Sequence, residues 1–467
     1  MSNFNFWESY PELDNNIFLV SNDRTWTYTQ LFNEADLIFK NQDRDILLLL
    51  ASKDSETVTA YIGAIRNGIV PFFVDSDIRE EALKRIIDAY RPRYIFHKNS
   101  YLTHFHEEVI EEILVSKESK ISILNYKTKD IHPKLGALLL TSGSTGDPKS
   151  VRISLSNFSV VTDSIVKYLG TTSSSRSVSL LPFHYSYGLS VLHNTMFSRG
   201  SIYLTNRSIF DKELINEMIN NKVTDISGVP FIFEIFSRMK LDELFSQLEC
   251  VTQAGGRLSI KYTRKMISLA NQFNFKYFTM YGQTEASPRI SYVPFEQATN
   301  KLGSVGKPIS CGSVRINPID ISVPTRGELI YTGKNVCLGY ASSFQDLSKD
   351  DEFMGEIKTG DIVEIDDDGY ISIIGRSKRF IKLKGVSVNL DHVEDIIKSN
   401  EIDAAVVGKD DNLVIVVNDF SKNHQYLTKV LKQNFNFHHS LVSFKEDNIE
   451  YLSSGKPDYV SLSSKYL

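Results

Sequence analysis

The segment from Thr141 to Lys149 reads Thr-Ser-Gly-Ser-Thr-Gly-Asp-Pro-Lys, a run of small hydroxyl residues and glycines that ends in a lysine. Such small residues let backbone N–H groups and hydroxyls approach phosphate oxygens, and the lysine adds a positive charge. This chemistry suits a triphosphate. The segment is not a Walker A loop, because that motif places Gly directly before its Lys and here Pro148 stands there. A flexible polar turn is the alternative that the segment alone leaves open.

Further segments carry residue types that suit nucleotide chemistry, and each also has a plain structural interpretation. The alternatives are a strand-end turn, a hairpin turn, a solvated charge cluster, an edge strand and a solvated lysine in a Ser/Gly tail. In chain order, the segments are Gln253-Ala254-Gly255-Gly256-Arg257, Met280–Glu285, Lys358–Asp361, Gly375–Lys378, Phe380–Val386 and Leu452–Asp458.

The order of these segments favours the functional interpretation, although a simple turn at Gln253–Arg257 and a solvated charge cluster around Lys378 stay open as alternatives. Residues 141–149 resemble the signature loop of the adenylate-forming superfamily, which includes acyl-CoA synthetases, firefly luciferase and nonribosomal-peptide adenylation domains. The later segments follow in that family's order, from about residue 138 to the C-terminus, with a family-like N-terminal lobe before them. The resemblance implies ATP-dependent activation of a carboxylic acid to an acyl-adenylate, with release of pyrophosphate and transfer of the acyl group to a pantetheine thiol of CoA.

The resemblance also implies a site for Mg²⁺ and ATP. Tyr281 stacks on adenine beside Gly282, Thr284 meets the α-phosphate and Glu285 holds the Mg²⁺, which agrees with the chemistry of an aromatic face, a hydroxyl and a carboxylate. Asp361 accepts hydrogen bonds from the ribose. The remaining implied nucleotide contacts are Thr141, Ser142, Gly143, Ser144, Thr145, Gly146, Lys149, Gly255, Gly256, Arg257 and Arg376.

The C-terminal segments supply the catalytic lysine and a hinge. Lys456 is the implied catalytic residue, since a cation placed where carboxylate, α-phosphate and leaving pyrophosphate meet stabilises the transition state. Thr284, Glu285 and Lys149 complete the catalytic set. Lys378 corresponds to the hinge residue, and the loop with Lys382 and Gly385 swings in for thioester formation.

The segment Leu181–Leu189 resembles the border of the acid pocket in acyl- and aryl-CoA synthetases. Amino-acid adenylation domains usually carry an aspartate where this chain has His184, so an α-amino acid substrate is disfavoured. We expect His184 to form a pocket wall and not to transfer a proton, and a hydrogen-bonded packing histidine is an equal alternative. The other predicted pocket residues are Tyr187, Gly282, Gln283 and Ala286.

Bulk properties favour a globular, multidomain enzyme. A chain of 467 residues exceeds one compact core, and 42% hydrophobic residues are ordinary for a globular protein. The net charge of -5 has no basic stripe, which argues against a nucleic-acid partner. Three widely spaced cysteines give no disulfide or zinc pattern, and no apolar run reaches the length of a membrane span. A cytoplasmic location is therefore predicted.

The elements that must position these residues form an α/β protein. Short apolar runs alternate with amphipathic stretches from Asp45 onward, which predicts two α/β subdomains with strands buried on both faces. A β-rich subdomain follows residue 304, with an Asp-Gly turn at 366–370. We place an N-terminal AMP-binding domain at 1–376 and a small mobile α+β lid domain at 377–467.

Departures from the family pattern leave alternatives open. Ser150 replaces a Gly that is usual after the loop lysine, Leu155 stands where a His is common, and the lid is short. A stand-alone enzyme that loads phosphopantetheine on an acyl carrier protein is therefore one alternative to a CoA ligase. The others are a luciferase-type oxygenase, an amide ligase and a catalytically silent nucleotide-binding regulator.

Overall fold

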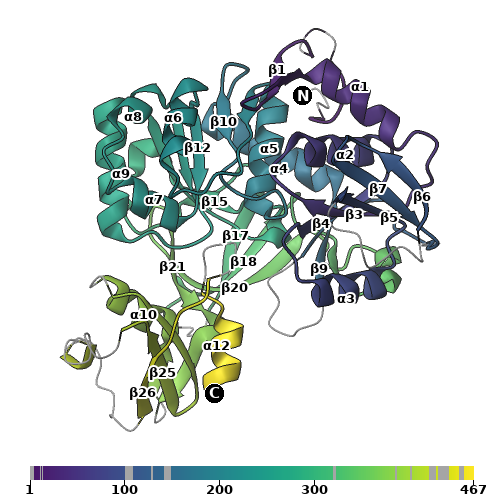
Figure 1. Ribbon diagram of the computed structural model, residues 1–467. Helices are drawn as coiled ribbons and strands as arrows, with labels where there is room; N and C mark the ends of the chain where they lie inside the picture. The colour runs from purple at the N-terminus through teal and green to yellow at the C-terminus, as the bar shows by residue number, and fades with distance from the viewer. Residues whose placement is uncertain are drawn as a thin grey trace.

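The protein is described from a computed structural model that covers residues 5–10, 12, 14–99, 109–127, 130–140, 149–318, 322–383, 386–399, 402–419, 427–429, 441–451 and 457–467. The predicted phosphate loop up to Pro148, Gly385 and Lys456 lie outside these residues, so their roles rest on the resemblance alone. Two large helix-covered sheets occupy most of the N-terminal part, and the C-terminal part extends to one side (Figure 1).

The first large sheet contains the earliest apolar run of the chain. Strand β3 (Ile46–Ala51) is buried along its whole length, because α2 (Ser55–Arg66) and α3 (Glu80–Tyr90) carry apolar faces beside the sheet. Helix α1 (Tyr28–Ile38) packs on α2. In spatial order the sheet is β19 (Gly339–Ala341), β9 (Ser150–Ser154), β8 (Leu135–Leu140), β4 (Val70–Asp75), β3, β5 (Tyr94–Lys98), β7 (Ser119–Leu124) and β6 (Val109–Leu114).

The second large sheet has nine strands and is parallel from β14 to β1. Its spatial order is β16 (Lys307–Pro308), β15 (Ser291–Tyr292), β14 (Lys276–Tyr281), β13 (Cys250–Gln253), β12 (Asp225–Gly228), β10 (Arg176–Val178), β11 (Ser201–Tyr203), β1 (Ile17–Val20) and β2 (Thr25–Thr27). Its outer helices are α6 (Lys212–Asn220), α7 (Pro230–Phe236), α8 (Asp242–Gln247) and α9 (Ile260–Phe273).

Helices α4 (Leu155–Leu169) and α5 (Ser186–Ser198) form the layer between the two sheets. Helix α4 contacts β8 and β9 of the first sheet, whereas α5 contacts β10 and β11 of the second, and the two helices pack on each other. One continuous apolar core therefore joins both sheets.

The β-rich region is a four-stranded antiparallel sheet of β17 (Gly312–Pro318), β18 (Arg326–Gly333), β20 (Glu356–Ile365) and β21 (Ile371–Arg376). The predicted Asp-Gly turn joins β20 to β21. Gly369 adopts a φ of 81°, and the Asp366 carboxylate accepts from the Tyr370 N–H at 2.8 Å.

The C-terminal region has its own core. It comprises β22 (Phe380–Leu383), β23 (Val386–Asn389), α10 (Leu390–Ser399), β24 (Ala404–Lys409), β25 (Asn412–Val417), β26 (Val442–Glu446) and α12 (Tyr459–Tyr466). Alternate residues of β24 belong to two hydrophobic clusters. Ala404 and Val406 pack in the cluster that includes α10, while Ala405 and Val407 pack in the cluster that includes α12. These clusters contain no residue before 381, although the domain boundary at 376 stays a prediction.

The structure confirms the predicted α/β class and corrects several element boundaries. The apolar run 177–181 predicts a strand, and the stretch after Leu189 predicts a helix. In the structure strand β10 ends at Val178 and helix α5 begins at Ser186, so His184 lies on a connection. The segment from Phe380 forms a hairpin strand with β23. Only 427–429 of the helix predicted over 426–434 are described, and they are helical.

Two predictions made from composition can be compared with the described residues. Cys250, Cys311 and Cys337 are all free, in agreement with the absence of a disulfide pattern. No helix in the described part of the chain is long and apolar enough to cross a membrane.

Candidate active site

Lys149 and Glu285 meet at one tyrosine that the sequence analysis missed. The Tyr340 hydroxyl donates to Glu285 Oε1 at 2.8 Å, and Lys149 Nζ lies 3.5 Å from the centroid of the Tyr340 ring. Burial and the neighbouring Glu285 carboxylate raise the pKa of Tyr340, so its hydroxyl stays protonated and can donate. The lysine assigned to the phosphates and the carboxylate assigned to Mg²⁺ thus both contact Tyr340, the lysine over its ring and the carboxylate at its hydroxyl.

Sheet pairing explains this meeting. Lys149 directly precedes β9, and β19 runs antiparallel to β9 with Tyr340 opposite Val151. The fully buried Arg152 donates to the Tyr340 and Leu338 carbonyls, at 3.1 Å each, and fixes the backbone of this edge strand. The only sequence signal for Tyr340 is an aromatic residue beside a glycine in a three-residue strand, which is too weak to predict a partner.

Tyr281 and Asp361 form the second meeting of predicted residues. Tyr281 ends β14, and its hydroxyl donates to Asp361 Oδ2 from the neighbouring sheet. Asp361 is 4% exposed, and its Oδ1 lies 3.4 Å from Nε of the exposed Arg376. Burial and the Asp361 charge raise the pKa of Tyr281 well above its usual value. Three residues assigned to the nucleoside end of ATP are therefore in contact.

The turn after β14 is built by close backbone packing. A Cβ on Gly282 would lie 1.8 Å from the Pro288 carbonyl oxygen and 2.9 Å from Arg289 Cα, so no larger residue fits. Asn335, which is fully buried, donates its side-chain amide to the carbonyls of Ala286 and Arg289. Gln283 precedes the 3₁₀ turn Thr284–Ala286 and accepts from the Ala286 N–H at 2.9 Å.

Thr284 also reaches the acid-pocket segment. Its hydroxyl lies 3.2 Å from the Ser186 hydroxyl at the start of α5. The residue assigned to the α-phosphate is therefore next to the residues assigned to the acid, as the attack of a carboxylate on that phosphate requires.

The segment from Gln253 to Arg257, which the resemblance places at the edge of the adenine, divides into two parts. Gly255 has a φ of 85°, and a Cβ there would lie 2.6 Å from the Tyr185 hydroxyl, while the Gly256 carbonyl accepts from Gln253 at 2.9 Å. Arg257 instead extends to α10 and pairs with Asp395 at 2.7 Å. Gly255 and Gly256 thus lie at the strand end, whereas the Arg257 side chain links this segment to the C-terminal region.

His184 has a partner that the sequence analysis did not foresee. Its Nε2 lies 3.5 Å from Asp75 Oδ2 at the end of β4, and its buried Nδ1 has no hydrogen-bond partner among the residues that the structure describes. Burial lowers the pKa of His184, with Asp75 and Asp77 acting in the opposite direction. A neutral imidazole at pH 7 agrees with the expected role as a pocket wall.

Tyr187 lies in the first turn of α5 and is almost fully buried. Its hydroxyl donates to Thr252 at 2.9 Å, and Arg289 lies 5.1 Å from its ring centroid. Burial raises the pKa of Tyr187 to about 12, while the charge of Arg289 acts against the rise. Arg289 follows the Tyr281–Glu285 segment by only four residues, but no local pattern in the sequence marks it as a site residue.

The predicted hinge and thiolation residues are solvent-facing where they are described. Lys378 is exposed in a short 3₁₀ turn, and Lys382 is exposed on β22. Between them, Arg379 donates to Asp391 and to the Val406 carbonyl and lies 4.0 Å from the Tyr459 ring centroid. Arg379 therefore anchors the C-terminal core where the chain leaves β21.

The residues present fit Mg²⁺ and ATP. In the described part of the chain no group of three or more His, Cys, Asp or Glu side chains could hold a metal. Mg²⁺ needs no such cage, because it commonly uses one or two carboxylates with phosphate oxygens and water. Glu285 supplies the carboxylate beside a threonine hydroxyl, and Asp361 offers buried acceptors for a diol.

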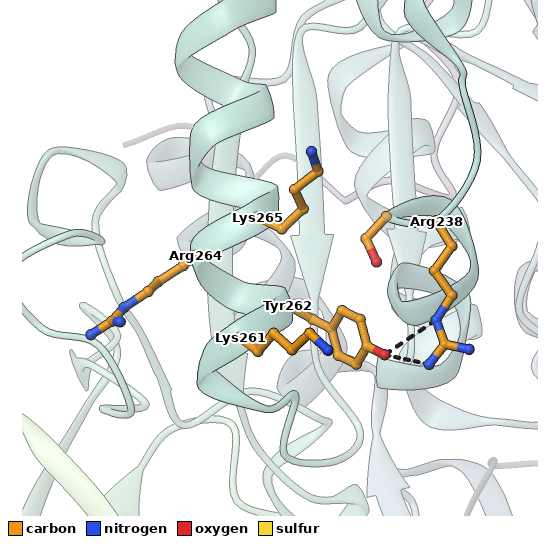
Figure 2. A pocket seen from close by; sticks show the side chains of 6 residues that line it. Arg238, Lys261, Tyr262, Arg264 and Lys265 are labelled. Carbon is orange, nitrogen blue, oxygen red and sulfur yellow. Dashed lines mark hydrogen bonds between the residues drawn. The ribbon is translucent and has the colours of Figure 1, made fainter. Parts of the chain in front are cut away.

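A separate basic hollow of about 740 Å³ lies on the outer helices. Ser237, Arg238, Lys261, Tyr262, Arg264 and Lys265 line it. Figure 2 shows Arg238 hydrogen-bonded to the Tyr262 hydroxyl, Lys261 beside the Tyr262 ring, and Arg264 directed away from them. None of these residues belongs to the nucleotide motifs.

Comparison with known proteins agrees with this geometry. AMP-binding enzymes match residues 6–341 as a family. The chain belongs to this family. It is 26% identical to 2-succinylbenzoate–CoA ligase of Bacillus licheniformis over 84% of each chain. It is 30% identical to the enzyme of that name from Staphylococcus aureus strain JH9, over 74% of this chain and 70% of the relative.

Among solved structures, the o-succinylbenzoate CoA synthetase of Bacillus subtilis in complex with an acyl-adenylate has the same fold. The TM-score is 0.75 at 21% identity, with 95% of this chain and 94% of that one covered. The predicted family, the fold class and the class of enzyme, an AMP-forming acid–thiol ligase, are confirmed.

Proposed function

We propose that this AMP-binding enzyme activates a carboxylic acid with Mg²⁺ and ATP and transfers the acyl group to the thiol of CoA. The observation that carries the proposal is the contact of Lys149 and Glu285 with Tyr340, since it joins a phosphate-binding lysine to a metal-binding carboxylate. The relatives named above act on 2-succinylbenzoate, which makes a keto acid with an aromatic ring the first acid to test.

The proposed roles combine the family resemblance with the contacts described above. Asp361 accepts from the ribose hydroxyls, Tyr281 lies against adenine, and Thr284 meets the α-phosphate. The bound Mg²⁺ supplies positive charge for the departing pyrophosphate, and Glu285 holds it in place. The residues of 141–149 bind the β- and γ-phosphates, and Lys456 stabilises the charge that develops during adenylyl transfer.

The second step needs a movement of the C-terminal region. We propose that residues 377–467 turn about Lys378, so that Lys456 withdraws and the hairpin with Lys382 and Gly385 faces the thiol. The exposed Arg257–Asp395 pair joins the two regions in the present arrangement, and an exposed pair contributes only about 0.2–1 kcal/mol. Such a contact opens at small energetic cost.

CoA is our proposed acceptor in preference to a carrier protein. The names of the relatives specify CoA, and the hollow with Arg238, Lys261 and Lys265 offers positive charge for phosphates. The cytoplasmic location remains a proposal that rests on cysteine usage.

The experiment supplies 2-succinylbenzoate, ATP and Mg²⁺ with CoA, pantetheine or a holo carrier protein in turn. We expect AMP release to accelerate most with CoA and a CoA thioester to accumulate. If only the carrier protein accelerated AMP release, the carrier protein and not CoA would be the acceptor. AMP release that no thiol accelerates would contradict the assignment as a thiol ligase.

A further inference from the structure

Arg289 is a buried cation without an anionic partner. It is 2% exposed, its Nε is buried with no hydrogen-bond partner, and no ion pair forms on it among the described residues. Its guanidinium lies 5.1 Å from the centroid of the Tyr187 ring, and its charge also acts on the buried hydroxyls of Tyr168 and Tyr185. An unpaired charge in a protein interior is costly, because desolvation is not offset by attraction.

The other two fully buried arginines are paired. Arg152 donates to the carbonyls of Leu338, Tyr340 and Asp350 at 3.0–3.1 Å and also to that of Lys349, and it pairs with Glu352 at 2.8 Å. Arg199 donates to the Phe6 and Glu8 carbonyls and lies 3.5 Å from Asp14. The Nε of Arg199 also lacks a hydrogen-bond partner, but both arginines have carbonyl acceptors and a nearby carboxylate. No such acceptor meets the Arg289 guanidinium in the part of the chain that the structure describes, and this difference indicates that a ligand supplies one.

The position of Arg289 identifies that ligand. Its Cα adjoins the backbone of Gly282, its N–H donates to the Ala286 carbonyl at 3.1 Å, and its guanidinium lies beside Tyr187. All three neighbours were predicted to line the acid pocket. The hydroxyl of Ser287, two residues away, is also buried and has no hydrogen-bond partner within the described ranges.

We infer that Arg289 receives a second carboxylate of the substrate, so that the enzyme selects a dicarboxylic acid and activates only one of its two carboxyl groups. This inference rests on the proposed acid activation. A guanidinium matches a carboxylate with two parallel hydrogen bonds. The same buried cation repels the ammonium of an α-amino acid, which adds a physical reason for disfavouring that substrate.

The test compares two acids of one skeleton in ATP–pyrophosphate exchange: 2-succinylbenzoate, and 4-oxo-4-phenylbutanoate, which lacks only the ring carboxylate. We expect the wild type to prefer the diacid in kcat/KM by on the order of 30-fold, the value for one lost partner of a buried charge pair. Arg289→Gln should reduce this ratio to below about threefold, and Arg289→Lys should restore part of it.

Thermal unfolding provides a readout that is independent of activity. Without ligand, Arg289→Gln should unfold at the wild-type temperature or above, whereas Arg199→Gln, which breaks satisfied contacts, should unfold at a lower one. The diacid alone should raise the Tm of the wild type and not that of Arg289→Gln.

Two results would overturn the inference: an unchanged acid preference in folded Arg289→Gln, or an equal loss of exchange with both acids. Absence of exchange with every acid in the wild type would instead contradict the proposed function. In that case the Tm response to the diacid still decides the role of Arg289.

Discussion

At the scale of single residues, the site depends on side chains that contact one another across different sheets. Tyr340 holds the Glu285 carboxylate by a 2.8 Å hydrogen bond and presents its ring to Lys149. Tyr281 likewise donates a hydrogen bond from its hydroxyl to the Asp361 carboxylate at the nucleoside end of the site. Each tyrosine thus orients a carboxylate before the nucleotide binds, which reduces the ordering that binding requires.

Tyr340→Phe tests this role because it removes the hydroxyl and keeps the ring. A hydrogen bond to a charged group contributes about 1.5–3 kcal/mol, so the Mg²⁺ concentration for half-maximal exchange should rise about tenfold or more. Tyr203→Phe is the matched control, since Tyr203 donates to Glu217 at 2.8 Å away from the site. If both variants needed the same Mg²⁺ concentration for half-maximal exchange, Tyr340 would have no role in holding the metal-binding carboxylate.

At the scale of elements, the sequence correctly predicted the strands and turns that depend on a local pattern of residues. Continuous apolar runs such as Ile46–Leu50 identified buried strands, and the Asp-Gly turn at 366–370 was placed correctly. Tyr340, Asp75 and Arg289 were missed, because their partners are set by pairings between distant segments that leave no local periodicity. The apolar run 177–181 predicts a strand that is longer than β10, because Leu180 and Leu181 pack on the core without joining the sheet.

The outer helices carry a second testable element, the basic hollow on α7 and α9. Lys261→Glu combined with Lys265→Glu should raise the KM for CoA about threefold to tenfold, because each exposed charge contributes on the order of 0.2–1 kcal/mol. Pantetheine lacks the nucleotide phosphates, so its KM should not change, and Lys212→Glu on α6 serves as the control. An equal change in the KM for CoA and for pantetheine would show that the hollow does not bind the nucleotide part of CoA.

At the scale of the whole molecule, stability should depend on pH through Asp225 at the start of β12. Burial raises the pKa of Asp225 to about 6, with Glu249 acting in the same direction and the Thr224 hydroxyl against it. The folded state therefore holds this proton where the unfolded chain has lost it. Stability falls as pH rises from about 4 to about 6, and the full loss persists above that range.

Asp225→Asn should cancel this loss, since the amide still accepts from Thr224 and carries no charge. A shift of about two pKa units corresponds to roughly 3 kcal/mol. In urea unfolding, the variant should exceed the wild type by up to that amount at pH 8 and match it near pH 4. A variant less stable than the wild type at pH 8 would refute the assignment.

Acid-dependent ATP–pyrophosphate exchange tests the central claim most directly. The wild type should exchange with a non-amino carboxylic acid from a panel of fatty, aryl, hydroxy, amino and dicarboxylic acids. Lys456→Ala should reduce the rate by about 10²–10³, as expected when a group that stabilises transition-state charge is removed, whereas Lys465→Ala on α12 should retain it. Undiminished exchange in Lys456→Ala, or no exchange with any acid in the wild type, would contradict the account.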